Sequence, residues 1–131
     1  MDIVADASVF LAVILNESSR DWVIETTVGL GAVAPEILPY EIANALVVVR
    51  RKGRLTDLEV LRAFENTQRI PVRLLPVTIP EAVRLAMRFG IYAYDAFYLQ
   101  CCIERQLPLI SLDARMCDVA RQLKIKVREG Q

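Results

Sequence analysis

Two patterns of apolar and polar positions alternate along the chain. Short, continuously apolar runs are typical of buried strands, and longer segments with apolar residues every three or four positions are typical of amphipathic helices. The predicted strands are 3–5, 32–34, 72–75, 109–111 and 125–127. The predicted helices are 9–15, 19–28, 39–51, 94–106, 114–124 and two segments that begin at residues 56 and 78. Apolar strands separated by helices predict an α/β fold in three layers, α/β/α, with a central parallel sheet.

Hydroxyl residues mark the start of several predicted helices. Ser8 is the expected cap of the first one. Thr56 and Thr78 are each followed three positions later by a glutamate, Glu59 and Glu81. This spacing predicts two capping boxes, in which the threonine and the glutamate bind each other's backbone N–H groups.

The size and composition of the chain are those of one folded domain. Its 131 residues are 54% hydrophobic and 24% charged, which excludes intrinsic disorder, and no compositional shift marks a linker. We therefore expect a single domain over residues 1–131. No apolar run approaches the about 18 residues of a membrane span, and no basic leader is present, so the expectation is a soluble, cytoplasmic protein without membrane contact. The three cysteines are expected to be core residues.

Charge and histidine content narrow the possible chemistry. Lys and Arg number 16, as do Asp and Glu, so the net charge of +0 gives no general attraction for nucleic acid. The chain contains 0 histidines, which excludes Ser-His-Asp triads, His-pair ribonucleases and His-ligated zinc. Carboxylates are the expected catalytic groups of an enzyme with this composition.

Four acids occupy positions where a carboxylate needs a partner. Asp6 and Asp113 follow predicted strands, and the carboxyl ends of parallel strands meet at one edge of the sheet. Glu41 and Asp95 lie in apolar stretches of predicted helices, with no Lys or Arg three or four positions away. The ordinary alternatives, a surface salt bridge or a helix cap, explain such acids less well.

Carboxylates that converge on one edge repel each other unless they are protonated or share a cation. Oxygen ligands without His or Cys suit Mg²⁺ or Mn²⁺. A metal ion held in this way activates water and stabilises the charge of a departing phosphate ester. The residues therefore predict a carboxylate metal site that hydrolyses phosphodiesters.

Other phosphate chemistry fits the chain less well. It has no glycine-rich Lys-Ser/Thr loop of a P-loop NTPase. A phosphatase of the haloacid-dehalogenase type requires a second Asp where Ser8 stands, and a receiver domain requires a phosphoacceptor Asp after a central strand, which 72–75 lacks. Both are minor alternatives.

The acids stand in motifs that resemble the PIN-domain family, in particular the toxin ribonucleases of VapBC toxin-antitoxin systems. The resemblance spans nearly the whole chain and implies a PIN-like fold. The motifs are Asp6 with Ser8, the segment Tyr40-Glu41-Ile42-Ala43-Asn44, the segment Tyr94-Asp95-Ala96, and Asp113 in ISLDARM. Each motif alone is weak, but four in this order are specific.

Carried over to this chain, the resemblance implies that Asp6, Glu41, Asp95 and Asp113 are catalytic and bind Mg²⁺ or Mn²⁺. Ser8 would support this pocket without binding the metal. The activity implied is that of a metal-dependent endoribonuclease whose products carry a 5′-phosphate and a 3′-hydroxyl. The partners implied are an RNA substrate, a cognate VapB-type antitoxin and a second copy of the chain in a homodimer.

Three further positions near these motifs bear on how complete the acidic site is. Asn44 lies one turn after Glu41, so it either holds Glu41, contacts substrate or is a surface amide. Some relatives carry a further acid where this chain has Arg115, which argues against a complete second metal site. Asp118 is a possible substitute, although a solvent-facing side chain is favoured.

The strongest basic cluster is Arg50, Arg51, Lys52 and Arg54, at the end of a predicted helix. Cations at this end complement the helix dipole, which is an adequate structural explanation. The alternative is a substrate-binding patch for RNA phosphates.

Tyr92, Tyr94 and Tyr98 are candidates for stacking on unpaired bases, although core packing is the favoured explanation. The competing functional class is a non-catalytic PIN-like module that binds RNA or protein, and an intact set of four acids argues against it.

Overall fold

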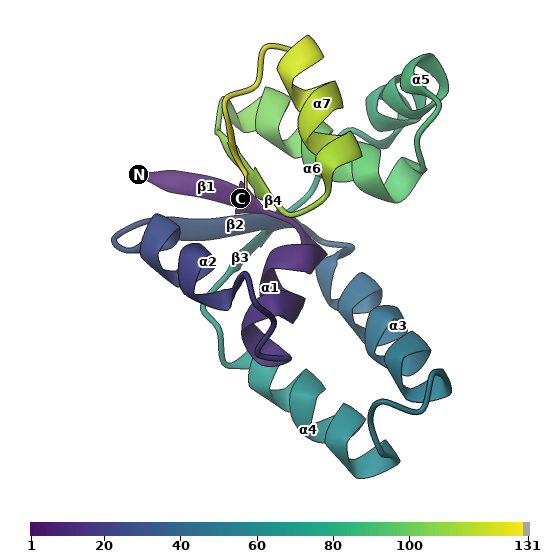
Figure 1. Ribbon diagram of the computed structural model, residues 1–131. Coiled ribbons are helices and arrows are strands. Elements are labelled where there is room, and N and C mark those ends of the chain that lie inside the picture. The colour runs from purple at the N-terminus through teal and green to yellow at the C-terminus, as the bar shows by residue number, and fades with distance from the viewer. Residues whose placement is uncertain (130–131) are drawn as a thin grey trace.

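The computed structural model describes residues 1–129 and contains a parallel sheet between two layers of helices (Figure 1). In chain order the elements are β1 (Asp2–Ala5), α1 (Ala7–Ile14), α2 (Arg20–Thr27), β2 (Gly31–Pro35), α3 (Leu38–Arg51), α4 (Asp57–Gln68), β3 (Arg73–Leu75), α5 (Ile79–Phe89), α6 (Ala93–Arg105), β4 (Leu109–Ser111), α7 (Ala114–Gln122) and β5 (Val127–Glu129).

The order of the five strands places a topological reversal at the centre of the sheet. The order is β3-β2-β1-β4-β5, and every neighbouring pair is parallel. The chain leaves β1 toward β2 and β3 on one side and later returns to β4 and β5 on the other. The register pairs Ala5 with Ile110, so Asp6 and Ser111 lie side by side at the carboxyl ends of β1 and β4. Parallel sheets form ligand sites at such a reversal.

Helices cover both faces of the sheet, which confirms the predicted three-layer α/β/α fold. Figure 1 shows α1 to α4 on one side and α5 to α7 on the other. On the second side, α6 packs on β1 and β2, α7 packs on β4 and β5, and α5 packs on α6. On the first side, α3 and α4 form a neighbouring pair that extends beyond the sheet (Figure 1).

The central strands are buried, as continuously apolar strands of a covered sheet must be. Ile3 and Val4 of β1 and Leu109 and Ile110 of β4 are at most 1% exposed. Leu99 of α6 packs in the same core and is also fully buried. Close packing on both sides gives the strand ends that carry the acids a rigid base.

The predicted elements are all present, with shifted ends. The cap of α1 is Asp6, which accepts a hydrogen bond from Val9 N at 3.3 Å, so the prediction of Ser8 as the cap is wrong. Ser8 lies inside the first turn because the helix begins directly after the strand. The last helix ends before Lys124, whose φ of 62° is left-handed, and the last strand begins two residues later than predicted.

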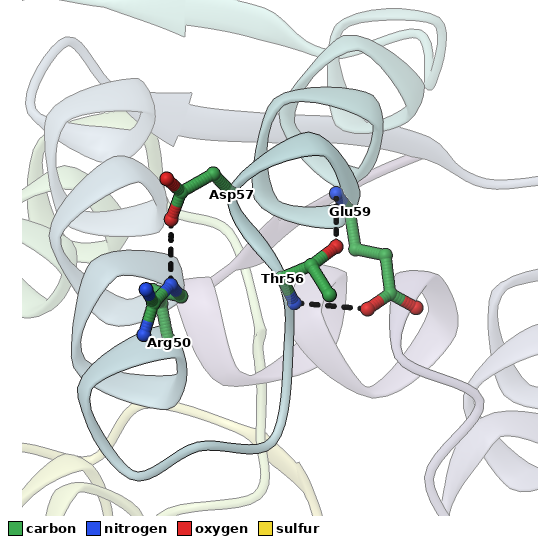
Figure 2. Close-up of polar contacts among 4 residues, drawn as sticks. All are labelled: Arg50, Thr56, Asp57 and Glu59. Carbon is green, nitrogen blue, oxygen red and sulfur yellow. Dashed lines mark hydrogen bonds and ion pairs between the residues drawn. The ribbon is translucent and has the colours of Figure 1, made fainter.

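One of the two predicted capping boxes is present. Thr56 Oγ1 accepts from Glu59 N at 3.2 Å, and Thr56 N donates to Glu59 Oε1 at 2.9 Å (Figure 2). The box predicted for Thr78 is wrong, because the N–H and the hydroxyl of Thr78 both donate to Glu104 of α6, at 3.0 and 2.9 Å. Glu81 instead binds the nearby Arg84 at 2.6 Å.

Two further expectations concern the whole chain. Among residues 1–129, no helix is both long enough and apolar enough to cross a membrane. All three cysteines are buried thiols, as expected of core residues.

The capping box provides a test of the α3–α4 pair. Replacing Thr56 by Ala should lower the free energy of unfolding by about 1 kcal/mol, because Glu59 N loses its acceptor at the helix start. Thr56→Ser keeps the hydroxyl and is the matched control. Urea denaturation followed by circular dichroism measures both, and equal stability of the Ala and Ser variants would contradict the role assigned to the box.

Candidate active site

Asp6 is a buried carboxylate at the junction of β1 and α1. It is 4% exposed. Its Oδ1 accepts from Ser8 Oγ at 2.5 Å and from Val9 N at 3.3 Å, and its Oδ2 accepts from Ser111 Oγ at 2.5 Å. Both oxygens are therefore fixed in direction by donors of the chain itself.

Two serine hydroxyls join this junction to the junction of β4 and α7. Ser8 Oγ donates to Asp6 and accepts from Leu112 N at 3.1 Å. Ser111 Oγ also donates to Asp6 and accepts from Asp113 N at 3.0 Å. Ser8 thus has the supporting position expected from the motif, whereas Ser111 was missed. Only its small, polar side chain in an otherwise apolar strand could have indicated it.

Asp113 caps α7 in the same way that Asp6 caps α1. Its Oδ1 accepts from Met116 N at 3.1 Å, and its backbone has the extended conformation of an N-cap. Both acids therefore lie at helix N-termini, where the helix dipole stabilises negative charge. Asp113 is exposed, whereas Asp6 is buried.

Burial raises the pKa of Asp6 above the ordinary value for aspartate, although the bonds from Ser111, Ser8 and Val9 act in the opposite direction. The neighbouring Asp113 raises it further. Asp6 therefore becomes easier to ionise when positive charge is brought near it.

Glu41 lies in the first turn of α3 and is half-buried. Burial raises its pKa, and Asp95 and Asp6 add to the effect. The Tyr98 hydroxyl of α6 faces it closely enough to lower the pKa of Glu41 in part. Even so, neither Glu41 Oε1 nor Tyr98 Oη makes a hydrogen bond of normal geometry, and both atoms are buried. Glu41 is therefore a partly buried carboxylate whose facing donor, the Tyr98 hydroxyl, does not complete a well-formed hydrogen bond, which is unusual for buried polar atoms.

Asp95 lies in the first turn of α6. Its pKa is raised to about 6, first by burial and then by the charges of Asp113 and Asp6. The charges of the four acids therefore act on one another from four separate elements. That they form one catalytic, metal-binding set stays a prediction. In the described part of the chain, no Lys or Arg forms an ion pair with any of them.

The donors of this site fit a hard divalent cation. The ligand atoms available are carboxylate and hydroxyl oxygens, and the acids have no basic partner among the described residues. Glu41 Oε1 is buried without a well-formed hydrogen bond. Over residues 1–129, no three acidic or thiol side chains already surround one point closely enough to hold a metal ion. Binding would therefore require the acids to draw together by rotation of their side chains.

Asn44 shares a pocket with Glu41, as their spacing on α3 predicts. Its side chain makes no hydrogen bond within residues 1–129, so holding Glu41 is not its role in this structure. Asp118 is exposed and accepts from Arg121 at 3.2 Å, which agrees with the favoured solvent-facing role. Arg115 donates to Phe89 O at 2.6 Å and so ties α7 to the end of α5.

The basic cluster lies at the opposite end of α3 from Glu41. Helix geometry separates Glu41 and Arg50 by about 14 Å along the axis. Arg50 Nε binds Asp57 Oδ1 at 2.6 Å and joins α3 to α4 (Figure 2). This contact gives Arg50 a structural function. Phosphate binding by the exposed Arg51, Lys52 and Arg54 stays a prediction.

Comparison with known proteins agrees with this geometry. The model of the PIN domain family matches residues 3–122. The chain is similar to the VapC ribonuclease Mb0985 of Mycobacterium bovis, with 28% identity over 119 residues, which cover 91% of each chain.

Two solved structures share the fold. One is PAE2754 from Pyrobaculum aerophilum, with a TM-score of 0.73, 22% identity, and coverage of 98% of this chain and 83% of that one. The other is VapBC2 from Rickettsia felis, solved bound to a DNA fragment from its promoter, with a TM-score of 0.68, 10% identity and 98% coverage of both chains. The family model matches nearly all of this sequence, and the acids lie at the predicted edge of the sheet. This chain therefore belongs to the PIN-domain family.

Proposed function

We propose that this protein is a divalent-metal-dependent endoribonuclease and the toxin of a VapBC-type toxin-antitoxin system. The observation that carries the proposal is a set of four acids, two at the carboxyl ends of β1 and β4 and two in the first turns of α3 and α6. Their charges act on one another, and none has a basic partner within residues 1–129. Similarity to a VapC ribonuclease over 91% of the chain supports the same reaction and the RNA substrate.

Asp6, Glu41, Asp95 and Asp113 are the residues that would hold Mg²⁺ or Mn²⁺. Bound there, the ion would supply an activated water and would stabilise negative charge on the phosphate that is cleaved. The chain's own contribution is to fix the direction of the carboxylates. The two hydroxyls on Asp6 do this most completely, since each of its oxygens accepts a hydrogen bond from one of them.

The partners follow from the same similarity. One solved structure with the same fold is VapBC2 of Rickettsia felis, which supports a VapB-type antitoxin as the partner of this chain. The proposal also includes a homodimer, a cytoplasmic location and a single PIN-like nuclease domain over residues 1–131.

A non-catalytic module that binds RNA or protein is the alternative. It would have no use for four neighbouring acids, three of which have a raised pKa, because acids that repel each other weaken both folding and RNA binding. The enzyme is therefore favoured.

The first test is cleavage of a mixed pool of single-stranded RNA in Mg²⁺, in Mn²⁺ and in EDTA. Asp95→Asn should reduce the cleavage rate by more than about 100-fold, because loss of a group that only supports a metal ligand already costs up to about that factor. EDTA should abolish cleavage. Asp118→Asn is the matched control, since Asp118 is a paired surface acid on α7, and should cleave at the normal rate. Cleavage that persists in EDTA or in Asp95→Asn would overturn the proposal.

The second test follows from the raised pKa values. A carboxyl group whose pKa is higher in the folded than in the unfolded protein favours folding at low pH and opposes it once ionised. The free energy of unfolding in EDTA should therefore fall as pH rises from about 4, where unfolded aspartate ionises, through about 6, where Asp95 ionises. The fall expected for the half-buried Asp95 is about 1 kcal/mol after solvent screening.

Urea titrations at several pH values measure this slope. Asp95→Asn should flatten it, Asp118→Asn should not, and Mg²⁺ at pH 7.5 should restore stability to the wild-type chain. Stability that rises with pH over this range, or a slope unaffected by Asp95→Asn, would contradict the account of the acids.

A further inference from the structure

A pocket opens beside Glu41, between α3 and the start of α6. Its walls include Tyr40 and Asn44 of α3 and Tyr94 of α6, and the small side chain of Ala45 leaves room between them. The metal-binding proposal uses only Glu41 of this group. The remaining lining residues have no function in it.

The two tyrosines of the pocket are exposed, unlike a tyrosine of the core. Tyr40 is 73% and Tyr94 is 54% exposed, whereas Tyr98 is 1% exposed and belongs to the core. Tyr40 directly precedes Glu41, and Tyr94 directly precedes Asp95, so each ring is carried on the same helical turn as an acid. The ring of Tyr94 contacts that of Phe97 edge to face, at 6.3 Å between centroids, which restricts its orientation.

Asn44 supplies the polar group of the pocket. It follows Tyr40 by four positions, so both side chains lie on one face of α3. Its amide carries a donor and an acceptor, and neither is engaged by another group of residues 1–129. An exposed amide that lines the same pocket as two aromatic rings is suited to the polar edge of a planar, neutral ring.

We propose that Tyr40, Asn44 and Tyr94 form a subsite for one unpaired nucleobase of the RNA, next to the catalytic acids. The tyrosine rings stack on the base, and the Asn44 amide hydrogen-bonds its edge. This inference rests on the proposed function, since it names the part of the RNA that the same site recognises.

The charge of the site favours a base over a phosphate at this point. Glu41 lines the pocket and no Lys or Arg does, so a phosphate there would meet an uncompensated negative charge, whereas a neutral base would not. Stacking on aromatic side chains is available to every base but only when the base is unpaired. The subsite therefore selects single strands and loops over duplex.

Tyr92 offers a matched control. It lies two residues from Tyr94, is 80% exposed, and is not among the residues that line the pocket. A general loss of aromatic surface near α6 would affect Tyr92 variants and Tyr94 variants alike, whereas a stacking subsite would affect only Tyr94 variants.

The test measures binding of a fluorescein-labelled single-stranded RNA octamer by anisotropy, in Mg²⁺ and in the Asp95→Asn background so that the probe stays intact. Tyr40→Ala and Tyr94→Ala should weaken binding about 5- to 100-fold, the range found for a stacking aromatic. Tyr40→Phe, Tyr94→Phe and Tyr92→Ala should bind within about twofold of the background. A second series uses octamers with one abasic position, placed at each site in turn. One of these octamers should bind the protein with both tyrosines as weakly as the complete octamer binds the Ala variants. The Ala substitutions should not weaken the binding of that abasic octamer any further.

The abasic series uses the chain without any tyrosine substitution, so it remains decisive if an Ala variant does not fold by circular dichroism. Equal binding of Ala and Phe variants, equal binding of all abasic probes, or absence of RNA binding would overturn the subsite.

The same experiments separate the subsite from the proposed nuclease activity. If the wild-type chain cleaves RNA but gives any of these results, the proposed nuclease function stands and the subsite is rejected. Tyrosine-dependent binding without cleavage would retain the subsite and reject the nuclease. An antitoxin peptide that binds in a tyrosine-dependent manner while RNA does not would assign the pocket to the protein partner and overturn the proposal.

Discussion

The burial of one carboxylate, that of Asp6, organises the end of the sheet. Asp6 ends β1, caps α1 and accepts hydrogen bonds from the hydroxyls of Ser8 and Ser111. Through these two serines it also orders the backbone of residues 112 and 113, from which Asp113 caps α7. One buried carboxylate thus couples two neighbouring strand-to-helix junctions. The other two acids, Glu41 and Asp95, are positioned by the helices that carry them, α3 and α6.

This arrangement opposes folding unless something relieves it. Burial raises the pKa of Asp6, Glu41 and Asp95, and the charges of the group raise it further. The apolar core beneath, formed by both faces of β1 and β4, offsets that cost. In a site where like charges repel one another, a ligand of opposite charge binds with the largest gain in free energy. The same site therefore explains both a weakness in stability and a capacity for catalysis.

The sequence was sufficient for the layers of the fold and for the places of Asp6 and Asp113 at strand ends, because both depend on local patterns. Apolar runs identify buried strands, and an acid that follows such a run must lie at the edge of the sheet. Ser111 escaped notice because a hydroxyl within an apolar strand has no pattern of its own, and its function depends on the parallel register with β1.

Contacts between distant segments account for the other differences. The Thr78 box failed because Glu104, 26 positions away, takes both of its donors. The tyrosine pocket depends on how α3 faces α6, which periodicity does not specify. The ion pair between Arg50 and Asp57 likewise depends on how α3 and α4 pack against each other.

The central claim is that the four acids bind a divalent cation. The measurement that tests it most directly is anomalous diffraction from crystals grown with Mn²⁺, because it locates the ion whether or not the right RNA is known. The account predicts a strong anomalous peak within coordination distance of Asp6, Glu41, Asp95 or Asp113 oxygens, and the loss of that peak in crystals of Asp6→Asn. Mn²⁺ bound elsewhere on the chain, with these carboxylates still apart and uncoordinated, would contradict it.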